Sequence, residues 1–154
     1  MKKRTLIAAL LLFALLLTGC QGTKEAPKEA LPLKEAVENA VKDKDSLVAY
    51  TAEDLSDILG IMPEDYTEAL FLMGSDSLSG REVIAVRAKD SAGLQKAKKA
   101  MENYLAQRKE ETRNYLPDAY KLQSDARVET KNLTAVLFIG PNAAEESRAF
   151  LAGE

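Results

Sequence analysis

Side chains able to carry out chemistry are few in this chain of 154 residues, which contains one cysteine and no histidine. The lack of histidine excludes Ser-His-Asp and Cys-His catalysis and any histidine-based zinc site. The serine-rich stretch GSDSLSG, Gly74 to Gly80, does not fit the Gly-x-Ser-x-Gly pattern of a nucleophilic serine. Asp43 and Asp45 flank a lysine without the glycine and final glutamate of a calcium loop. The sequence therefore predicts a protein that is not an enzyme and uses no metal or cofactor.

The single cysteine, Cys20, follows a positively charged and then apolar N-terminal stretch. Lys2, Lys3 and Arg4 precede a run from Leu6 to Leu17 that contains no polar side chain. A charged start followed by an apolar core of this kind is typical of a secretory signal. A helix that spans a membrane needs about 20 apolar residues, so the run is short for a permanent anchor. The sequence predicts an exported protein with a signal peptide at residues 1–19.

The residues around the expected cut, Leu17-Thr18-Gly19-Cys20, resemble the lipobox of bacterial lipoproteins. The resemblance implies that the Cys20 thiol is alkylated with a diacylglyceryl group and that a peptidase cuts before Cys20. Two acyl chains hold a protein stably at a membrane, whereas one gives marginal binding. The expected partner of Cys20 is thus the lipid bilayer, and the expected location is the outer face of the cell membrane. The alternative is an ordinary signal peptide or signal anchor with a cysteine nearby by chance.

Removal of the signal peptide would take away three basic residues from a chain whose net charge is already −3. An acidic exported domain has no electrostatic basis for binding nucleic acid, so none is expected as a partner. Residues 20–32 contain Pro27, Pro32 and one leucine among small and charged residues, a composition that cannot bury enough apolar surface to fold. We interpret residues 20–32 as a lipidated cysteine and flexible tether, and residues 33–154 as a single extracytoplasmic domain.

Periodicity within residues 33–154 predicts both helices and strands. A first helix begins at Leu33, and a second follows Thr51, which can form a capping box with Asp54. Leu55, Ile58 and Leu59 are expected to face inward, and Gly60 is expected to end the second helix. A long helix is expected between a cap at Asp90 or Ser91 and Pro117, and a last one after Asn142.

Four strands are predicted where the period changes to two or the run becomes wholly apolar. They are Tyr66–Met73, Glu82–Ala88, Gln123–Thr130 and Leu133–Ile139, with a tight turn at Lys131-Asn132 between the last two. Paired hairpins give antiparallel neighbours, so we expect an α+β domain. Its antiparallel sheet of about four strands would pack against the long helix, with short flanking helices.

Several segments of this domain resemble an uncharacterised family of small lipoproteins of Gram-positive, clostridia-like bacteria. The segments are TAEDLSDILGI followed by PEDY, REVIAVRAKD, NYLPDAY and KNLTAVLFI. The similarity spans Leu47 to Phe150, nearly the whole domain. It implies a membrane-tethered extracytoplasmic protein and carries no established activity.

Tyr115, Pro117 and Tyr120 form the first candidate contact patch, because two tyrosines that bracket a proline can make a rigid, amphipathic surface. The alternative is that both rings pack the end of the long helix onto the sheet. Gly74 to Gly80 is the second candidate. The hypothesis favoured by the sequence is a non-enzymatic binding or accessory module that contacts another envelope protein. A small-ligand sensor or carrier and a histidine-independent enzyme are the alternatives.

Overall fold

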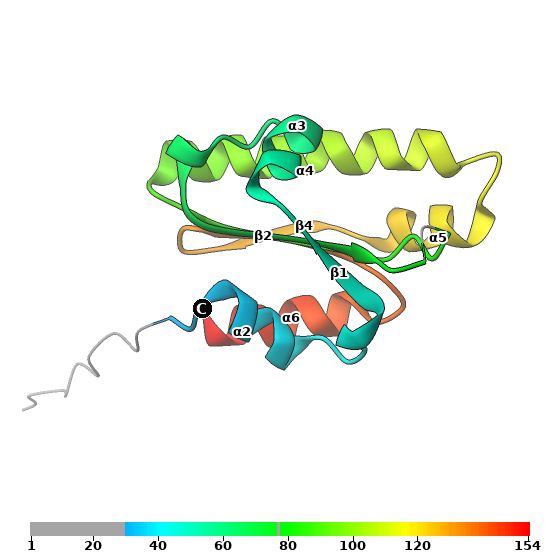
Figure 1. Cartoon of the computed structure of the whole chain (residues 1–154), viewed down its shortest axis with the longest axis horizontal. Helices are drawn as coiled ribbons and strands as arrows, with labels where there is room; N and C mark the ends of the chain where they lie inside the picture. The colour runs from blue at the N-terminus through cyan, green and yellow to red at the C-terminus, as the bar shows by residue number, and fades with distance from the viewer. Residues whose placement is uncertain (1–29, 77) are drawn as a thin grey trace, which may run out of the picture.

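One antiparallel sheet of five strands forms the centre of the computed structural model, which describes residues 30–76 and 78–154 (Figure 1). The strand order is β1-β2-β3-β5-β4, so β1 and β4 are its edges. The strands are β1 (Leu47–Tyr50), β2 (Tyr66–Gly74), β3 (Glu82–Ala88), β4 (Val128–Lys131) and β5 (Thr134–Ile139). The helices are α2 (Leu33–Ala40), α3 (Ala52–Leu59), α4 (Ser91–Thr112), α5 (Pro117–Asp125) and α6 (Ala143–Gly153), with single 3₁₀ turns η2 (Lys44–Ser46) and η3 (Pro63–Asp65).

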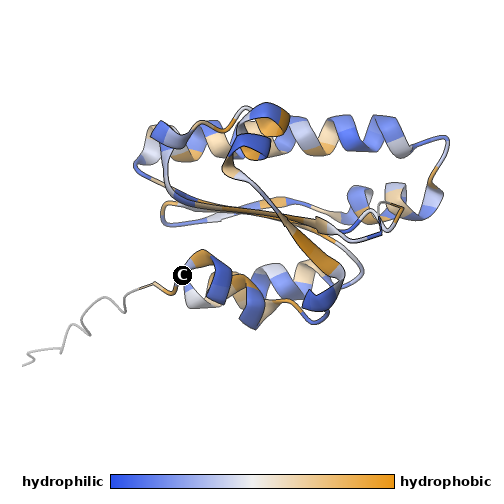
Figure 2. Ribbon diagram, viewed as in Figure 1, coloured by the Kyte–Doolittle hydropathy of each residue, from blue (hydrophilic) through white to orange (hydrophobic). Residues whose placement is uncertain are grey.

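Helices cover both faces of this sheet. The long helix α4 and the short α3 lie over one face, and α2 and α6 lie over the other (Figure 1). Each face therefore has its own core, one centred on Phe71 and Met101 and the other on Phe138 and Phe150. The inner strands β3 and β5 contribute to both cores, which explains why their sequences are almost continuously apolar. The outer surface of α4 is largely hydrophilic (Figure 2).

Local signals position the helices as the sequence predicts. Thr51 accepts a hydrogen bond from the Asp54 N–H, and the Asp54 carboxylate accepts one from the Thr51 N–H, which completes the capping box at the start of α3. Gly60 ends α3 in the left-handed conformation, with φ of 70°. The Asp90 carboxylate accepts a hydrogen bond from the Gly93 N–H and caps α4.

The predicted fold class, an α+β domain with an antiparallel sheet and a long helix, is confirmed. The prediction omitted β1, a four-residue strand that pairs with β2. It was also wrong about Gln123–Thr130, because Gln123 belongs to α5 and the strand begins only at Val128. Pro117 does follow the long helix, but it also starts α5, since proline needs no N–H partner at the first helical position.

Two smaller predictions also need correction. The hairpin turn after β4 is at Asn132-Leu133, one residue later than predicted, with Asn132 at φ of 53°. Asn132 tolerates this left-handed conformation better than most residues. Ile58 does not face inward and remains 45% exposed. The α3 helix is only two turns long and packs on β2 and α4 through Leu55 and Leu59, which leaves Ile58 outside the core.

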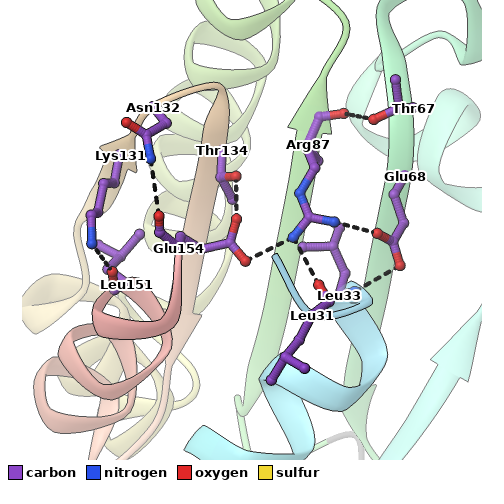
Figure 3. Close-up of polar contacts among 10 residues, drawn as sticks. All are labelled: Leu31, Leu33, Thr67, Glu68, Arg87, Lys131, Asn132, Thr134, Leu151 and Glu154. Atoms are coloured by element: carbon purple, nitrogen blue, oxygen red, sulfur yellow. Dashed lines mark hydrogen bonds and ion pairs between the residues drawn. The ribbon is translucent and has the colours of Figure 1, made fainter. Parts of the chain in front are cut away.

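An arginine-centred cluster fixes the start of α2 against the sheet and against the end of α6 (Figure 3). The Arg87 guanidinium donates to Glu68 at 2.6 Å, to the Glu154 carboxylate at 2.7 Å and to the Leu31 carbonyl at 3.0 Å. Glu68 also accepts a hydrogen bond from the N–H of Leu33, the first residue of α2. The path of the chain as it enters the domain is therefore set by charged hydrogen bonds to β2 and β3. No helix within residues 30–76 and 78–154 combines the length and the hydrophobicity that a membrane-spanning segment needs.

Candidate contact surface at the α5 end

The turn between α4 and α5 holds the tyrosine patch that the sequence indicates. Tyr115 lies in this turn and is 83% exposed, which rules out the alternative that its ring packs onto the sheet. Pro117 is exposed at the first position of α5, and Tyr120, one turn further along, is half-buried. Cys20, the other predicted site residue, lies outside the described residues.

Hydrogen bonds across the turn hold α5 against the end of α4. The N–H groups of Tyr115 and Leu116 donate to the Thr112 carbonyl at 3.1 and 2.9 Å. The Thr112 hydroxyl, which is buried, donates to the Gln123 side-chain oxygen at 2.5 Å. Gln123 is completely buried in α5, and so this contact links the two helices where water is excluded. Tyr115 is thus presented from a turn with a defined backbone.

The second predicted candidate, the loop from Gly74 to Gly80, lies against α5. A β-carbon added to Gly80 would be 2.6 Å from the Ala119 β-carbon, closer than such atoms approach in proteins. Gly80 also has φ of 63°, a left-handed conformation that favours glycine. The two sequence candidates, which are separated along the chain by β3 and α4, are therefore brought to one end of the molecule by a glycine–alanine contact.

This loop presents one apolar side chain to solvent. The Leu78 N–H donates to the Asp76 carboxylate at 2.9 Å, and the Ser79 N–H donates to the Asp76 carbonyl at 3.0 Å. At the base of the loop, the Gly74 N–H donates to the Arg81 carbonyl at 2.8 Å. The Leu78 side chain is 64% exposed despite these restraints on its backbone.

We define the α5-end surface as Leu78, Tyr115, Pro117 and Tyr120. Tyr115 and Leu78 are the two most exposed large apolar side chains in residues 30–76 and 78–154. In Figure 1, α5 and the β2–β3 loop lie at one end of the long axis, and residues 30–33, where the described chain enters α2, lie at the other. The surface offers two aromatic rings with hydroxyl groups and one aliphatic side chain, a combination suited to contact with another protein.

Sequence reasoning missed a buried ionic cluster between β3 and α4. The Glu82 carboxylate, 1% exposed, accepts hydrogen bonds from the Tyr104 hydroxyl at 2.6 Å and from Arg108 Nε at 3.0 Å. Burial, reinforced by the negative charge of Glu82, holds the pKa of the Tyr104 hydroxyl well above its usual value. Each Glu82 oxygen accepts a hydrogen bond from an α4 side chain, and so the cluster attaches α4 to β3 of the sheet. No sequence signal identifies it, because Glu82 simply precedes an apolar strand and Tyr104 is one member of a helical stripe.

One hollow lies on each side of β1. The larger, the α2–β1 groove, has a volume of about 410 Å³ and runs between α2 and the β1–β2 edge. Its apolar lining comprises Val37, Val41, Leu47, Ala49, Leu70 and Leu72, and its charged rim comprises Lys34, Glu38, Lys44 and Asp45. The smaller hollow, about 290 Å³, lies on the α4 side and is lined by Tyr50, Ile58, Met73, Tyr104, Gln107, Arg108 and Glu111. The charged side chains of the larger groove are all exposed at its rim. They therefore do not converge inside the groove, as the polar groups of a small-molecule site would.

Within the part of the chain that the structure describes, cysteine and acidic side chains form no group of three or more that could hold a metal ion. Comparison with curated proteins and with solved structures gave no match. A family model described as a domain of unknown function, DUF4358, matches residues 38–140. This span includes all five strands and the α5-end surface, and it confirms the expectation of an uncharacterised family domain. The chain belongs to the DUF4358 family.

Proposed function

We propose that this protein is a lipoprotein anchored by lipid to the outer (extracytoplasmic) face of the cell membrane, and that its domain is a non-enzymatic binding or accessory module. In this proposal Cys20 carries the diacylglyceryl group, residues 21–32 form the tether, and the α5-end surface contacts another envelope protein. The charged start, the apolar run and the Leu17-Thr18-Gly19-Cys20 sequence support the anchoring part of the proposal.

The observation that carries the binding part is the position of Tyr115 and Leu78. These exposed side chains belong to the α4–α5 turn and to the β2–β3 loop. Both segments lie at the end of the domain opposite the point where residues 30–33 enter it (Figure 1). A domain tethered through its N-terminal end would direct its opposite end away from the bilayer. Tyr115 and Leu78 would then be free to meet a partner that projects from the same membrane or from the cell wall.

Anchoring is tested by replacing the thiol in the full-length protein. Cys20→Ser should abolish labelling by radioactive palmitate and leave an uncut precursor, because a hydroxyl is a far poorer nucleophile than a thiol for accepting the lipid. A Cys20→Ser protein that is still labelled and trimmed would disprove the lipobox interpretation.

Binding is tested by placing a photo-crosslinking amino acid at Leu78 in the full-length protein in its native membrane. A specific adduct should form, and Tyr115→Ala should reduce its yield about tenfold or more, as expected for loss of an aromatic anchor of about 2 kcal/mol. Tyr115→Phe keeps the ring and should retain most of the adduct.

The same crosslinker at Lys99, an exposed residue of α4, is the control. An equal adduct from Lys99, or a Leu78 adduct that is unaffected by Tyr115→Ala, would contradict a partner at the α5-end surface. Because Tyr115 is 83% exposed, neither of its replacements should change the stability of the domain, which thermal unfolding can verify.

A further inference from the structure

The two edges of the sheet differ in how they are protected against pairing with another strand. The edge strand β4 has the sequence VETK, and its charged residues are bound by α6: Glu129 accepts from the Ser147 hydroxyl, and Lys131 donates to the Leu151 carbonyl. The other edge, β1, has the sequence LVAY and carries no charge or proline. Charged residues, proline and coverage are the usual devices that prevent edge pairing, and β1 has only its short length.

At alternate residues of β1, the backbone hydrogen-bonding groups point away from the sheet, where a further strand could pair. The Ser75 N–H donates to the Ser46 carbonyl at 2.7 Å, so Ser46 points its backbone groups at β2. In an antiparallel pair such residues alternate, and therefore the backbone groups of Val48 also point at β2 while those of Leu47 and Ala49 point away from it. The Leu47 N–H donates to the Lys44 carbonyl, so the Ala49 N–H is the outward donor that a further strand can use. Among the described strands, only β2 pairs with β1. Figure 1 shows β1 crossing in front of the other strands, at the open edge of the sheet.

The side chains of β1 leave both faces of this edge partly uncovered. Leu47 and Ala49 face the α2–β1 groove. Val48 and Tyr50 face the other side, where Tyr50 contacts the Phe71 ring and both remain 40–50% exposed. A strand added beside β1 would thus extend an apolar surface on each face of the sheet.

We propose that β1 pairs with β1 of a second copy of this chain, which joins two sheets into one across a two-fold axis. The symmetry places Leu47 opposite Ala49 of the second copy. The Ala49 N–H of each copy would then donate to the Leu47 carbonyl of the other, while the Leu47 N–H keeps its hydrogen bond to the Lys44 carbonyl of its own chain. Val48 meets Val48 of the second copy on the axis as a pair without mutual hydrogen bonds, in which side chains are closest.

Charge and symmetry favour a second copy over a different protein. The chain as a whole is acidic, which opposes self-association. The rim of the α2–β1 groove, however, has two lysines and two acidic residues, Lys34, Lys44, Glu38 and Asp45, and is locally neutral. A second copy brings the same two lysines and two acidic residues, with its β1 running in the opposite direction. It also supplies an uncharged four-residue strand at the edge of its own sheet. The proposal does not depend on the function proposed for the α5-end surface or on the lipid.

A single cysteine at the axis tests the pairing and its register. If Val48 lies opposite Val48 of the second copy, Val48→Cys in the full-length protein gives two facing cysteines. Their Cα atoms would be about 4.5 Å apart, a distance that permits a disulfide. Mild oxidation, in membranes and in detergent-purified protein, should give a reducible dimer at least about tenfold more abundant than in the controls, because paired strands raise the effective thiol concentration. The controls are the unmodified chain, which has only Cys20, and Leu133→Cys, which adds an exposed thiol at the opposite side of the sheet.

Ala49→Pro in the Val48→Cys background tests the role of the backbone. It removes an outward N–H while leaving the hydrogen bonds to β2 intact, so the dimer should be lost with the domain still folded by circular dichroism. If Ala49→Pro unfolds the domain, Val48→Lys replaces it, and this variant should have the mass of a monomer by light scattering where the unmodified chain has that of a dimer. A Val48→Cys protein that stays monomeric, that crosslinks as strongly as Leu133→Cys does, or that crosslinks to a different protein would overturn the proposal.

Discussion

Gly80 and Ala119 approach so closely that the loop after β2 cannot pack on α5 if position 80 has a side chain. The distance of 2.6 Å between an added β-carbon and that of Ala119 and the positive φ of Gly80 act together. Gly80→Ala should therefore lower the free energy of unfolding by about 2–4 kcal/mol, the sum of a strained φ and overpacking. Chemical denaturation of the purified protein measures this change.

Gly60→Ala separates the two contributions to this cost. Gly60 also has a positive φ, 70°, but no atom lies within 4 Å of an added β-carbon. Its replacement should cost only about 1 kcal/mol. Equal costs at Gly60 and Gly80 would show that the contact with Ala119 is unimportant.

The buried cluster of Glu82, Tyr104 and Arg108 should make the stability of the domain sensitive to alkaline pH. The pKa of Tyr104 is raised in the folded state, so the folded protein keeps this proton after the unfolded chain has begun to lose it. The corresponding stabilisation is complete below the unfolded tyrosine pKa of about 10 and is lost as pH rises beyond it, by about 1.4 kcal/mol per pH unit. Denaturation curves between about pH 8 and 11, a range that brackets the unfolded pKa, measure this slope.

Tyr104→Phe should remove that part of the slope and lower stability at neutral pH by about 1–2 kcal/mol, because Glu82 loses a buried hydrogen-bond donor. Tyr115→Phe, at a tyrosine exposed to solvent, should leave the stability at neutral pH unchanged. A slope that persists in the Tyr104→Phe protein would assign the alkaline sensitivity to other groups.

The capping box of α3 should weaken under acid. Hydrogen bonds from the backbone and then the hydroxyl of Thr51 lower the pKa of Asp54 in the folded protein. A depressed pKa stabilises the fold above the unfolded aspartate value of about 3.9, and the effect is lost as pH falls through the folded pKa. The difference in free energy of unfolding between the unmodified protein and Asp54→Ala should thus shrink as the pH falls from about 6 through the pKa of Asp54 in the folded protein. A difference that stays constant over this range would mean that the Asp54 charge is not involved.

Much of the fold can be predicted from local patterns. Strands β2, β3 and β5 are long enough, and apolar enough, for their periodicity to be read directly, and the caps at Thr51 and Asp90 locate two helices. These features depend on residues close together in the chain. The exposure of Tyr115 could not be derived in this way, because it depends on where α5 packs.

The missed elements are those decided by distant contacts. Strand β1 has four residues, and three of them are exposed, so its pattern differs little from that of a loop until β2 pairs with it. Helix α5 forms because Gln123 and Ala119 are buried against α4 and the Gly80 loop, and proline at its first position conceals its start. Glu82 was missed for the same reason, since its partners are on α4, more than twenty residues away.

The Arg87 cluster provides the last prediction, which concerns the region where the chain enters the domain. Arg87 bridges Glu68 and Glu154, and the Glu154 side chain is only 4% exposed (Figure 3). Arg87→Ala would leave this buried carboxylate without its cation and should reduce the free energy of unfolding by about 2–4 kcal/mol. Arg113→Ala, which breaks an exposed pair with Glu110, should cost less than about 1 kcal/mol. Adding Glu154→Gln to Arg87→Ala should recover part of the loss, since the uncompensated charge is then absent, and denaturant titrations of the single and double variants measure this coupling. If the double variant is no more stable than Arg87→Ala, the cost lies in lost packing of the arginine and not in the ion pair.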